Sequence, residues 1–362
     1  MDLHGGDVDR YIKYAWEEGG SDILLLAGSP PMVRIDGQMC PIEGESVQDE
    51  ESIRGQLVLL LTAPKLAEFE EEGEADFTLG WESQARLRGN AFYQRGMPTV
   101  SLRIIPEDIP TFDDLGIPPA VRNLAELPQG LVLFTGPTGS GKSTSLASIV
   151  NSINNRRACH ILTIEDPIEY VHPSRLAAVS QREVGTDTKS FERALRSALR
   201  EDPDVIQVGE MRDPESIGIT LTLAETGHLV LSTLHTNDAS QALDRIVDVF
   251  PAERQTQVRI QLASSLQAVV AQRLVPRIGS GMVAAFEVLV CTPAVRNLVR
   301  EGKSRQLRNN MTLGQAEGMQ TLEMSLNALL RAGLITYDDA MAHALVPHEI
   351  ERPLPPPPPP RG

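Results

Sequence analysis

Residues 130–150 read GLVLFTGPTGSGKSTSLASIV, and this stretch decides the fold. The apolar run 131–134 is followed by a glycine-rich segment and then by a run of helical character. That order is the strand–loop–helix context of a phosphate-binding loop, and residues 136–144 fit the pattern GxxxxGK[ST] at every position. In such a loop the backbone N–H groups face one concavity, and the helix start adds unpaired N–H groups and its dipole. The stretch therefore predicts a P-loop domain.

The loop also indicates which ligands it takes. We expect Lys142 to reach the β- and γ-phosphates of ATP, and Ser143 to coordinate Mg²⁺. The glycines also fit a dinucleotide-binding GxGxxG pattern, but a dinucleotide site has no use for the Lys142–Ser143 pair. The predicted nucleotide contacts are Gly136, Pro137, Thr138, Gly139, Ser140, Gly141, Lys142, Ser143 and Thr144.

Two acidic clusters end apolar runs further along the chain. One is ILTIEDPIEY (161–170), with Glu165, Asp166 and Glu169, and the other is DPDVIQVGEMRD (202–213), with Glu210. Carboxyl ends of strands are where ligands bind in open parallel sheets, so both clusters are candidates for catalysis. We expect Glu165 to orient the attacking water and Glu210 to face Mg²⁺, although the two roles could be exchanged. Gln207, within the second run, needs a local hydrogen-bond partner if it is buried.

Histidines bracket the next apolar run. GHLVLSTLHTNDA (227–239) places His228 before it and His235 after it. We interpret the pair as a phosphate sensor, against the alternative that each histidine is structural. Arg88, Arg95 and Arg103 lie in a different part of the chain; each alone reads as a surface residue, or as an arginine finger that reaches the γ-phosphate from another domain or subunit.

The chain reads as two domains and a tail. Residues 1–105 have the texture of a small mixed α/β domain, and the proline-rich stretch 106–120 reads as a linker. In 121–350, short apolar runs alternate with helical stretches, which predicts a largely parallel sheet with helices on both faces, and 253–345 reads as mostly helical. The end of the chain, 351–362, holds seven prolines and predicts a polyproline II tail.

Composition narrows the class of protein. A net charge of −16 opposes broad attraction to nucleic acid or anionic lipid. The three cysteines are scattered without a CxxC pair, which fits a reducing compartment and no zinc site. No run approaches the roughly 18 apolar residues of a membrane span, so we expect a cytoplasmic protein without direct membrane insertion.

Four segments together resemble the ATPases of the type II/IV secretion superfamily. They are GPTGSGKST (136–144), ILTIEDPIEYVH (161–172), ALRSALREDPDVIQVGEMRDPES (194–216) and AETGHLVLSTLHTNDA (224–239). In order and spacing they are similar to the family's Walker A, Asp box, atypical Walker B and His box. The resemblance implies an α/β fold in which a small PAS-like mixed α/β N-terminal domain precedes a RecA-like P-loop ATPase domain with a helical C-terminal portion.

Within the superfamily the chain resembles the PilT-like, pilus-retraction branch. PAVRNLVRE (293–301) is similar to a segment associated with retraction, the three cysteines cannot form the tetracysteine insert of assembly ATPases, and we expect no N-terminal extension of the assembly type. The resemblance implies a homohexamer that powers type IV pilus retraction at the cytoplasmic face of the inner membrane, against a platform protein. It also implies that Arg88, Arg95 and Arg103 contact the γ-phosphate.

Other readings stay open at this point. They are a pilus-assembly or type II secretion ATPase, a nucleotide-binding regulatory ring without turnover, and a RecA-like DNA motor, which the acidic balance opposes. In 293–301, helical spacing predicts one buried face and one exposed face. The expected buried residues are Ala294, Val295, Leu298 and Val299, and the expected exposed residues are Arg296 and Arg300.

Overall fold

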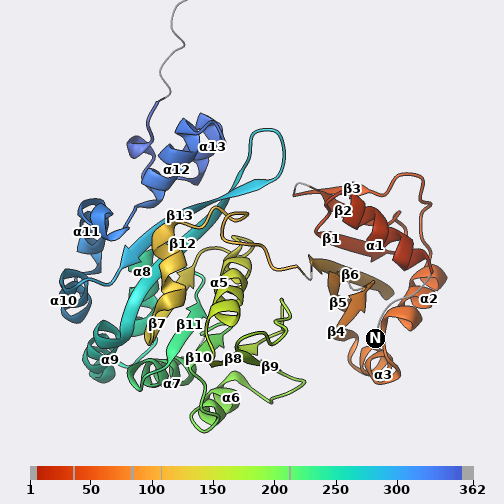
Figure 1. The fold of residues 1–362 in the computed structure, drawn as a ribbon. Helices are drawn as coiled ribbons and strands as arrows, with labels where there is room; N and C mark the ends of the chain where they lie inside the picture. The colour runs from red at the N-terminus through yellow and green to blue at the C-terminus, as the bar shows by residue number, and fades with distance from the viewer. Residues whose placement is uncertain (1–5, 36, 83–84, 107, 212, 353–362) are drawn as a thin grey trace, which may run out of the picture. The chain divides into compact units, whose positions relative to one another are not determined.

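The structure is a computed structural model that describes residues 6–35, 37–82, 85–106, 108–211 and 213–352. Contacts divide it into two compact units, Met1–Asp108 and Ile109–Gly362, which are described separately (Figure 1). Residues 353–362, the bulk of the predicted proline tail, lie outside the described residues. The segment expected as a linker falls mostly in the second unit, where Ile117 is buried in the core and Phe112 and Leu115 pack against it.

The first unit is a six-stranded antiparallel sheet in the order β3-β2-β1-β6-β5-β4, with three helices that contribute to its apolar core. The helical stretch after β3 is divided into two helices, α2 and α3, because the chain turns extended at Leu61 and restarts with Pro64 in the first turn of α3. The elements are α1 (Asp7–Glu17), β1 (Asp22–Leu26), β2 (Met32–Ile35), β3 (Gln38–Pro41), α2 (Glu50–Leu60), α3 (Ala63–Glu72), β4 (Glu74–Trp81), β5 (Ala85–Gln94) and β6 (Met97–Pro106).

The β5–β6 hairpin shows how local sequence sets this sheet. Its two-residue turn is Arg95-Gly96, and both residues have positive φ (52° and 77°), as a type I′ turn requires. On the core side, Gly89 lies directly opposite Phe77 on the neighbouring strand β4. A Cβ at Gly89 would come within 2.1 Å of the Phe77 ring, so the position requires glycine. Alternation along β5 then places Arg86, Arg88 and Asn90 on the less buried face of the sheet.

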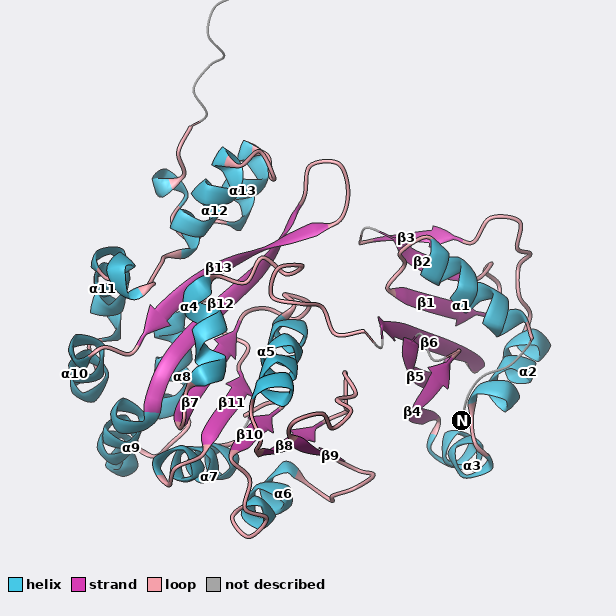
Figure 2. Cartoon of the chain, viewed as in Figure 1, coloured by secondary structure: helices cyan, strands magenta, loops and turns pink. Residues whose placement is uncertain are grey.

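The second unit is a seven-stranded sheet in the order β13-β12-β7-β11-β10-β8-β9 (Figure 2). Every neighbouring pair is parallel except β12–β13. The central strand β7 is buried along its length, with Leu131 and Leu133 in one apolar cluster and Val132 and Phe134 in the other. Helices thus cover both faces, as predicted. The strands are β7 (Gly130–Thr135), β8 (His160–Glu165), β9 (Ala178–Glu183), β10 (Val205–Val208), β11 (Leu229–Thr233), β12 (Leu266–Pro276) and β13 (Met282–Val290).

Buried side chains group the described helices of this unit into three clusters. One joins α6, α7, α8, α9, α10 and α11, a second joins α4 and α5, and a third joins α12 and α13. Gln207 on β10 is buried, but its Oε1 has no hydrogen-bond partner within the described residues, contrary to expectation. The helices are α4 (Pro119–Arg122), α5 (Lys142–Arg156), α6 (Phe191–Ala198), α7 (Pro214–Glu225), α8 (Ala239–Asp248), α9 (Ala252–Ser265), α10 (Pro293–Glu301), α11 (Leu307–Leu313), α12 (Leu322–Arg331) and α13 (Tyr337–His343).

The prediction that 253–345 is mostly helical is wrong in its middle. Two long strands, β12 and β13, form an antiparallel hairpin there, and β12 also pairs with β7. The apolar run LQAVVAQRLVP fits a buried strand as well as a helix, and periodicity alone does not separate the two. The run forms a strand because it pairs with β7, which lies more than 130 residues earlier in the sequence.

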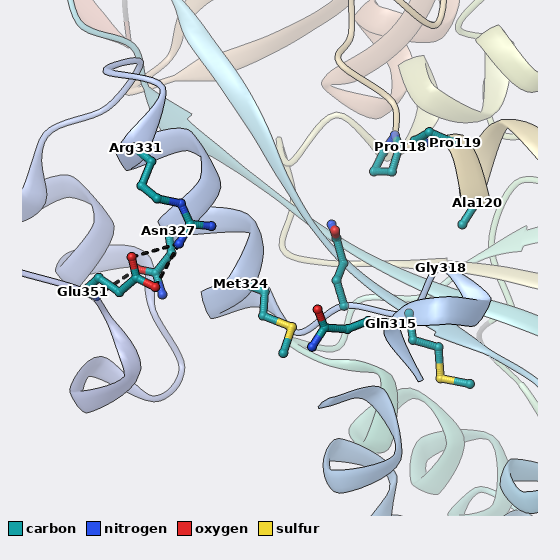
Figure 3. A pocket seen from close by; sticks show the side chains of 11 residues that line it. Pro118, Pro119, Ala120, Gln315, Gly318, Met324, Asn327, Arg331 and Glu351 are labelled. Atoms are coloured by element: carbon teal, nitrogen blue, oxygen red, sulfur yellow. Dashed lines mark hydrogen bonds and ion pairs between the residues drawn. The ribbon is translucent and has the colours of Figure 1, made fainter. Parts of the chain in front are cut away.

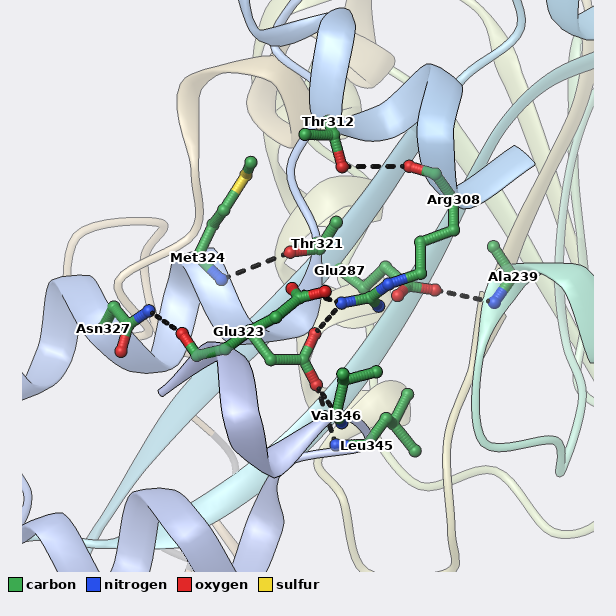
Figure 4. Close-up of polar contacts among 11 residues, drawn as sticks. Ala239, Glu287, Arg308, Thr312, Thr321, Glu323, Met324, Asn327, Leu345 and Val346 are labelled. Atoms are coloured by element: carbon green, nitrogen blue, oxygen red, sulfur yellow. Dashed lines mark hydrogen bonds and ion pairs between the residues drawn. The ribbon is translucent and has the colours of Figure 1, made fainter. Parts of the chain in front are cut away.

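The C-terminal part of the second unit is held by a buried carboxylate (Figure 4). Glu323 on α12 is 1% exposed; its Oε2 accepts from Arg308 Nη2 at 2.8 Å, and its Oε1 accepts from the backbone N–H groups of Leu345 and Val346, each at 2.8 Å. Burial acts to raise the pKa of Glu323, but the Arg308 ion pair and the Val346 N–H outweigh it and hold the pKa below its usual range. The ionised carboxylate therefore fixes the end of the described chain to α12.

A second buried carboxylate in the same region behaves oppositely. Glu287 on β13 is 1% exposed, and its Oε1 accepts from the N–H of Ala239, the first residue of α8, at 2.8 Å. Burial raises the pKa of Glu287 to about 7. The folded chain therefore binds this proton more tightly than the unfolded chain between roughly pH 4.5 and 7, so the stability that Glu287 contributes falls as pH rises through that window.

We predict that Glu287→Gln stabilises the protein relative to wild type increasingly as pH rises from 5 to 8. The amide oxygen can still accept from Ala239 N–H, and no buried charge forms; the gain is at most about 3 kcal/mol for a shift of this size. Melting temperatures of both proteins across this pH range test it, with exposed Glu317→Gln as the control that should show no such trend. A constant difference between Glu287→Gln and wild type would contradict the prediction.

Candidate nucleotide site

The P-loop joins the end of β7 to the start of α5. Gly136, Gly139 and Gly141 have φ values of 143°, 78° and 83°, which side-chain-bearing residues rarely adopt. A Cβ at Gly136 would sit 2.3 Å from the carbonyl oxygen of Gln272 on β12, so the loop lies directly against that strand. Pro137, at the loop's tip, is exposed together with the two residues after it.

Lys142, the first residue of α5, is buried against the loop that precedes it. Its Nζ donates to the carbonyl oxygens of Gly136 at 2.8 Å and Pro137 at 2.9 Å. Burial lowers the pKa of Lys142, and the nearby charges of Glu210 and Glu169 act in the opposite direction. Lys142 is therefore surrounded by oxygen acceptors and placed where the carboxylates of two other segments reach it.

Parallel strands bring those segments to the P-loop edge of the sheet. β8 ends at Glu165, and Gly209 after β10 donates its N–H to Ile164 O at 2.8 Å. After β11, Leu234 donates its N–H to Phe134 O at 2.8 Å, and the hydroxyl of Thr135 donates to Thr236 O at 2.7 Å. The structure therefore gathers Lys142, Glu165, Glu210 and His235 at one edge of the sheet.

Glu165 is the most buried of these acids. Its side chain accepts from Thr163 Oγ1 at 2.6 Å and from Gln181 Nε2 at 3.3 Å. Burial raises the pKa of Glu165 to about 7, and these two hydrogen bonds only partly oppose the shift. A carboxyl group with a pKa near the working pH exchanges a proton readily, which is what a general base requires.

Glu210 is more open and has a different neighbour. Its side chain is 22% exposed, and its Oε1 lies 3.3 Å from His235 Nε2. Ser143 follows Lys142 in the first turn of α5, and the charge of Glu210 acts on Lys142. Hydroxyl and carboxylate oxygens are ligands that Mg²⁺ accepts when substrate phosphates supply the others, and the pair therefore fits this ion. No cluster of three or more His, Cys, Asp or Glu suited to a metal occurs in the described part of the chain.

The structure does not bring His228 to this site. It precedes β11, at the amino end of that strand, where its Nδ1 lies 2.9 Å from Leu223 O and its carbonyl accepts from Gly130 N at 3.0 Å. The two ends of a five-residue strand are roughly 17 Å apart, and only the carboxyl end faces the P-loop. His235 is thus the histidine of the pair that lies beside Glu210 at the P-loop edge of the sheet.

The three predicted arginines lie in the first unit, and the sheet brings two of them together. Arg88 on β5 is directly opposite Arg103 on β6. Arg95 instead occupies the exposed β5–β6 turn, roughly 23 Å along the strand from Arg88 at about 3.3 Å per residue.

Sequence reasoning missed several residues of the site. Glu169 lay in a quoted cluster but received no role, and Tyr170 beside it places its hydroxyl 3.1 Å from Thr144 Oγ1. Gln181 holds both Glu165 and the carbonyl of Tyr170. Gln272 accepts from Ser145 Oγ at 2.9 Å, and it could not be found because its strand was read as helix.

A hollow of about 540 Å³ lies in the second unit, lined by residues outside the P-loop (Figure 3). Its walls come from α4 and from the region of α12, and include Pro118, Met324 and the ion pair between Arg331 and Glu351 at 2.9 Å. None of the P-loop residues lines it. Size alone therefore does not locate the chemistry of this protein.

Comparison with known proteins identifies the relatives of this site. Residues 32–320 match the family described as "Type II/IV secretion system protein". The chain belongs to this family. Among curated relatives, it is 46% identical to the type IV pilus retraction ATPase PilT of Pseudomonas aeruginosa, over 94% of this chain and 99% of that protein. It is 47% identical to a twitching motility protein of Neisseria gonorrhoeae, over 88% of this chain and 85% of that protein.

Solved structures of related ATPases also match this chain. The chain matches a crystal structure of the pilus retraction motor PilT with bound ADP at a TM-score of 0.86 and 47% identity, over 96% of this chain and 99% of that one. It matches the ATPase DotB of Legionella pneumophila at a TM-score of 0.82 and 26% identity, over 94% of this chain and 98% of that one. The PilT-like assignment and the α/β fold class, with an N-terminal domain before the ATPase domain, are confirmed.

Residues 293–301 form α10, and the faces of this helix differ from the prediction. Val295 and Val299 are buried and Leu298 packs against the core, but Ala294 is exposed. Arg296 is half-buried, because its Nη1 donates to Ala263 O at 2.7 Å and Ser264 O at 2.9 Å in the last turn of α9. It therefore caps the C-terminus of α9, whereas Arg300 is exposed.

Within the described residues, no helix has both the length and the apolar character needed to cross a bilayer.

We predict that Glu165→Gln and Glu210→Gln both lose turnover but differ in binding. Removing Glu210 should weaken Mg–ATP affinity more, because Glu210 acts near Lys142 and Ser143. Wild-type kcat should rise with pH through about 7 as Glu165 ionises, and Glu165→Gln should lose this limb. Titration with a fluorescent nucleotide and pH profiles of phosphate release test both points. If Glu165→Gln weakens affinity more than Glu210→Gln does, the two roles are exchanged.

Proposed function

We propose that this chain is an ATP-hydrolysing motor that powers type IV pilus retraction and disassembly, and hence twitching motility. The observation that carries the proposal is full-length likeness to a pilus retraction ATPase, combined with a complete P-loop whose lysine faces two carboxylates. We further propose a homohexamer at the cytoplasmic face of the inner membrane, acting on the pilus platform protein. No contact with nucleic acid belongs to this function.

The residues of the site divide the work of hydrolysis. The backbone N–H groups of the P-loop and the Lys142 ammonium bind the phosphates, and the start of α5 adds its dipole. Mg²⁺, held by Ser143 and Glu210, would neutralise phosphate charge. Glu165 holds the attacking water and accepts its proton, which its pKa of about 7 permits. His235 orients Glu210 through their 3.3 Å contact.

The N-terminal unit supplies the remaining positive charge in this proposal. Arg88 and Arg103 contact the γ-phosphate of a nucleotide bound to the P-loop unit of the same or a neighbouring chain. Arg95, which was expected to make the same contact, lies roughly 23 Å along the strand from Arg88 and is too far away to share that phosphate. Charge on the γ-phosphate oxygens grows in the transition state, and guanidinium groups stabilise it. Binding and release of the nucleotide then change the arrangement of the two units, which is how hydrolysis yields mechanical work.

Lys142→Ala tests the proposal at the enzyme and in cells. It removes the one lysine of the phosphate cradle, so phosphate release should fall at least about a hundredfold and nucleotide binding should weaken. In a strain with the gene deleted, cells should carry surface pili but not twitch, and the wild-type gene should restore twitching whereas Lys142→Ala should not. A deletion strain without pili would instead indicate an assembly ATPase, and a wild-type protein without turnover would indicate a regulatory ring.

The α10 arginines provide a matched pair of variants. Arg300→Ala should leave the protein folded and active in hydrolysis, because Arg300 is exposed and, within the described residues, its side chain hydrogen-bonds only to Asn297 on its own helix. In cells we expect the same variant to prevent retraction. Arg296→Ala should instead lower stability by roughly 1–3 kcal/mol, because two carbonyl groups of α9 lose a charged donor. Melting temperature, ATPase rate and twitching are measured for both. Normal twitching with Arg300→Ala would reduce α10 to a scaffold.

A further inference from the structure

A row of polar side chains crosses the N-terminal sheet on its less buried face. Register places Arg34, Asp22, Arg103, Arg88 and Thr78 directly opposite one another along β2, β1, β6, β5 and β4. Side chains so paired have Cβ atoms about 4.5–5.5 Å apart, and like charges in this position repel. The adjacent guanidinium groups of Arg103 and Arg88 therefore need an anion beside them.

Asp22 supplies that anion on one side. Its Oδ1 accepts from Arg103 Nε at 2.8 Å, while its Oδ2 accepts from Ser21 Oγ at 2.7 Å and lies 3.5 Å from Arg34 Nε. The Asp22 side chain is only 16% exposed, whereas that of Arg103 is 58% exposed. Asp22 Oδ1 thus binds Arg103, and Asp22 is the shorter and more buried side chain of the two.

The geometry leaves the other side of Arg103 for a ligand. The bond to Asp22 uses Nε, and the two terminal nitrogens of Arg103 make no hydrogen bond within the described residues. Arg88 has no side-chain hydrogen-bond or ion-pair partner in that part of the chain. Both arginines, with Asp22 and Ser101, line a hollow of about 250 Å³. A guanidinium held at Nε presents its terminal nitrogens as a fixed pair of donors, the geometry that a phosphate accepts.

We propose that Asp22 is a positioning residue for hydrolysis: it holds Arg103 with its terminal nitrogens toward the γ-phosphate. The inference rests on the proposed function, because it assigns Arg103 a nucleotide contact. Asp22 does not itself touch the nucleotide. It orients Arg103 before the phosphate arrives, so that less side-chain freedom is lost when charge develops on the γ-phosphate. The P-loop still supplies most of the affinity for ATP.

Asp22→Asn tests this directly, because it keeps the shape and removes the charge that holds Arg103. We expect kcat to fall about tenfold while KM for ATP changes less than about twofold. Asp22→Glu, which retains the charge, should recover part of kcat. Glu74→Gln is the matched control: it removes one carboxylate from the same face of β4, but Glu74 is exposed and does not line this hollow, so kcat should be unchanged.

A double-mutant cycle shows whether Asp22 acts through Arg103. In an Arg103→Ala background, adding Asp22→Asn should change kcat by less than about twofold. Melting temperature and oligomer mass identify any variant that is only misfolded or unassembled, and Asp22→Glu then gives the comparison. If Arg103→Ala loses activity but Asp22→Asn does not, or if their losses multiply, the inference is wrong and the proposed function stands. A wild-type protein without ATPase activity overturns both.

Discussion

Parallel pairing of β7, β11, β10 and β8 is the constraint on which the site depends. In a parallel sheet all carboxyl ends meet at one edge, so the P-loop, Glu165, Glu210 and His235 converge although they are spread over about a hundred residues of sequence. Backbone hydrogen bonds, such as that from Gly209 N–H to Ile164 O at 2.8 Å, hold the segments that follow the strands in place. The same constraint sends His228 to the opposite edge.

Burial then assigns different chemistry to similar side chains. Glu165, Glu287 and Glu323 are all buried acids, yet burial raises the pKa of the first two to about 7, while Arg308 holds that of Glu323 below its usual range. The difference lies in whether a guanidinium is within contact. A paired carboxylate locks structure in place, whereas an unpaired one stays ready to exchange a proton near neutral pH. Glu323, at the C-terminal helices, is of the first kind; Glu165, at the P-loop edge of the sheet, and Glu287, on β13, are of the second kind.

Local patterns revealed much of this molecule in advance. The P-loop, the acidic ends of β8 and β10 and the parallel sheet were predicted because each depends on short-range sequence: glycines that tolerate positive φ, and apolar runs of strand length. The β12–β13 hairpin was not, because its neighbour β7 is distant in sequence. For the same reason the sequence did not reveal Gln272, the capping contacts of Arg296 or the ion pair of Asp22 with Arg103.

The close approach of Gly136 to β12 means that this one strand contacts both the P-loop and the C-terminal helices. One residue of β12, Gln272, touches the P-loop; the next, Arg273, donates to the carbonyl of His343 at the end of α13; and Val275 is buried against α12 and α13. Three to four residues of extended chain, roughly 10 Å, thus separate the phosphate cradle from the C-terminal helices. Extended backbone is stiff in tension, and over these residues β12 is also paired with β13, so a load on the C-terminal helices has a short covalent route to the P-loop.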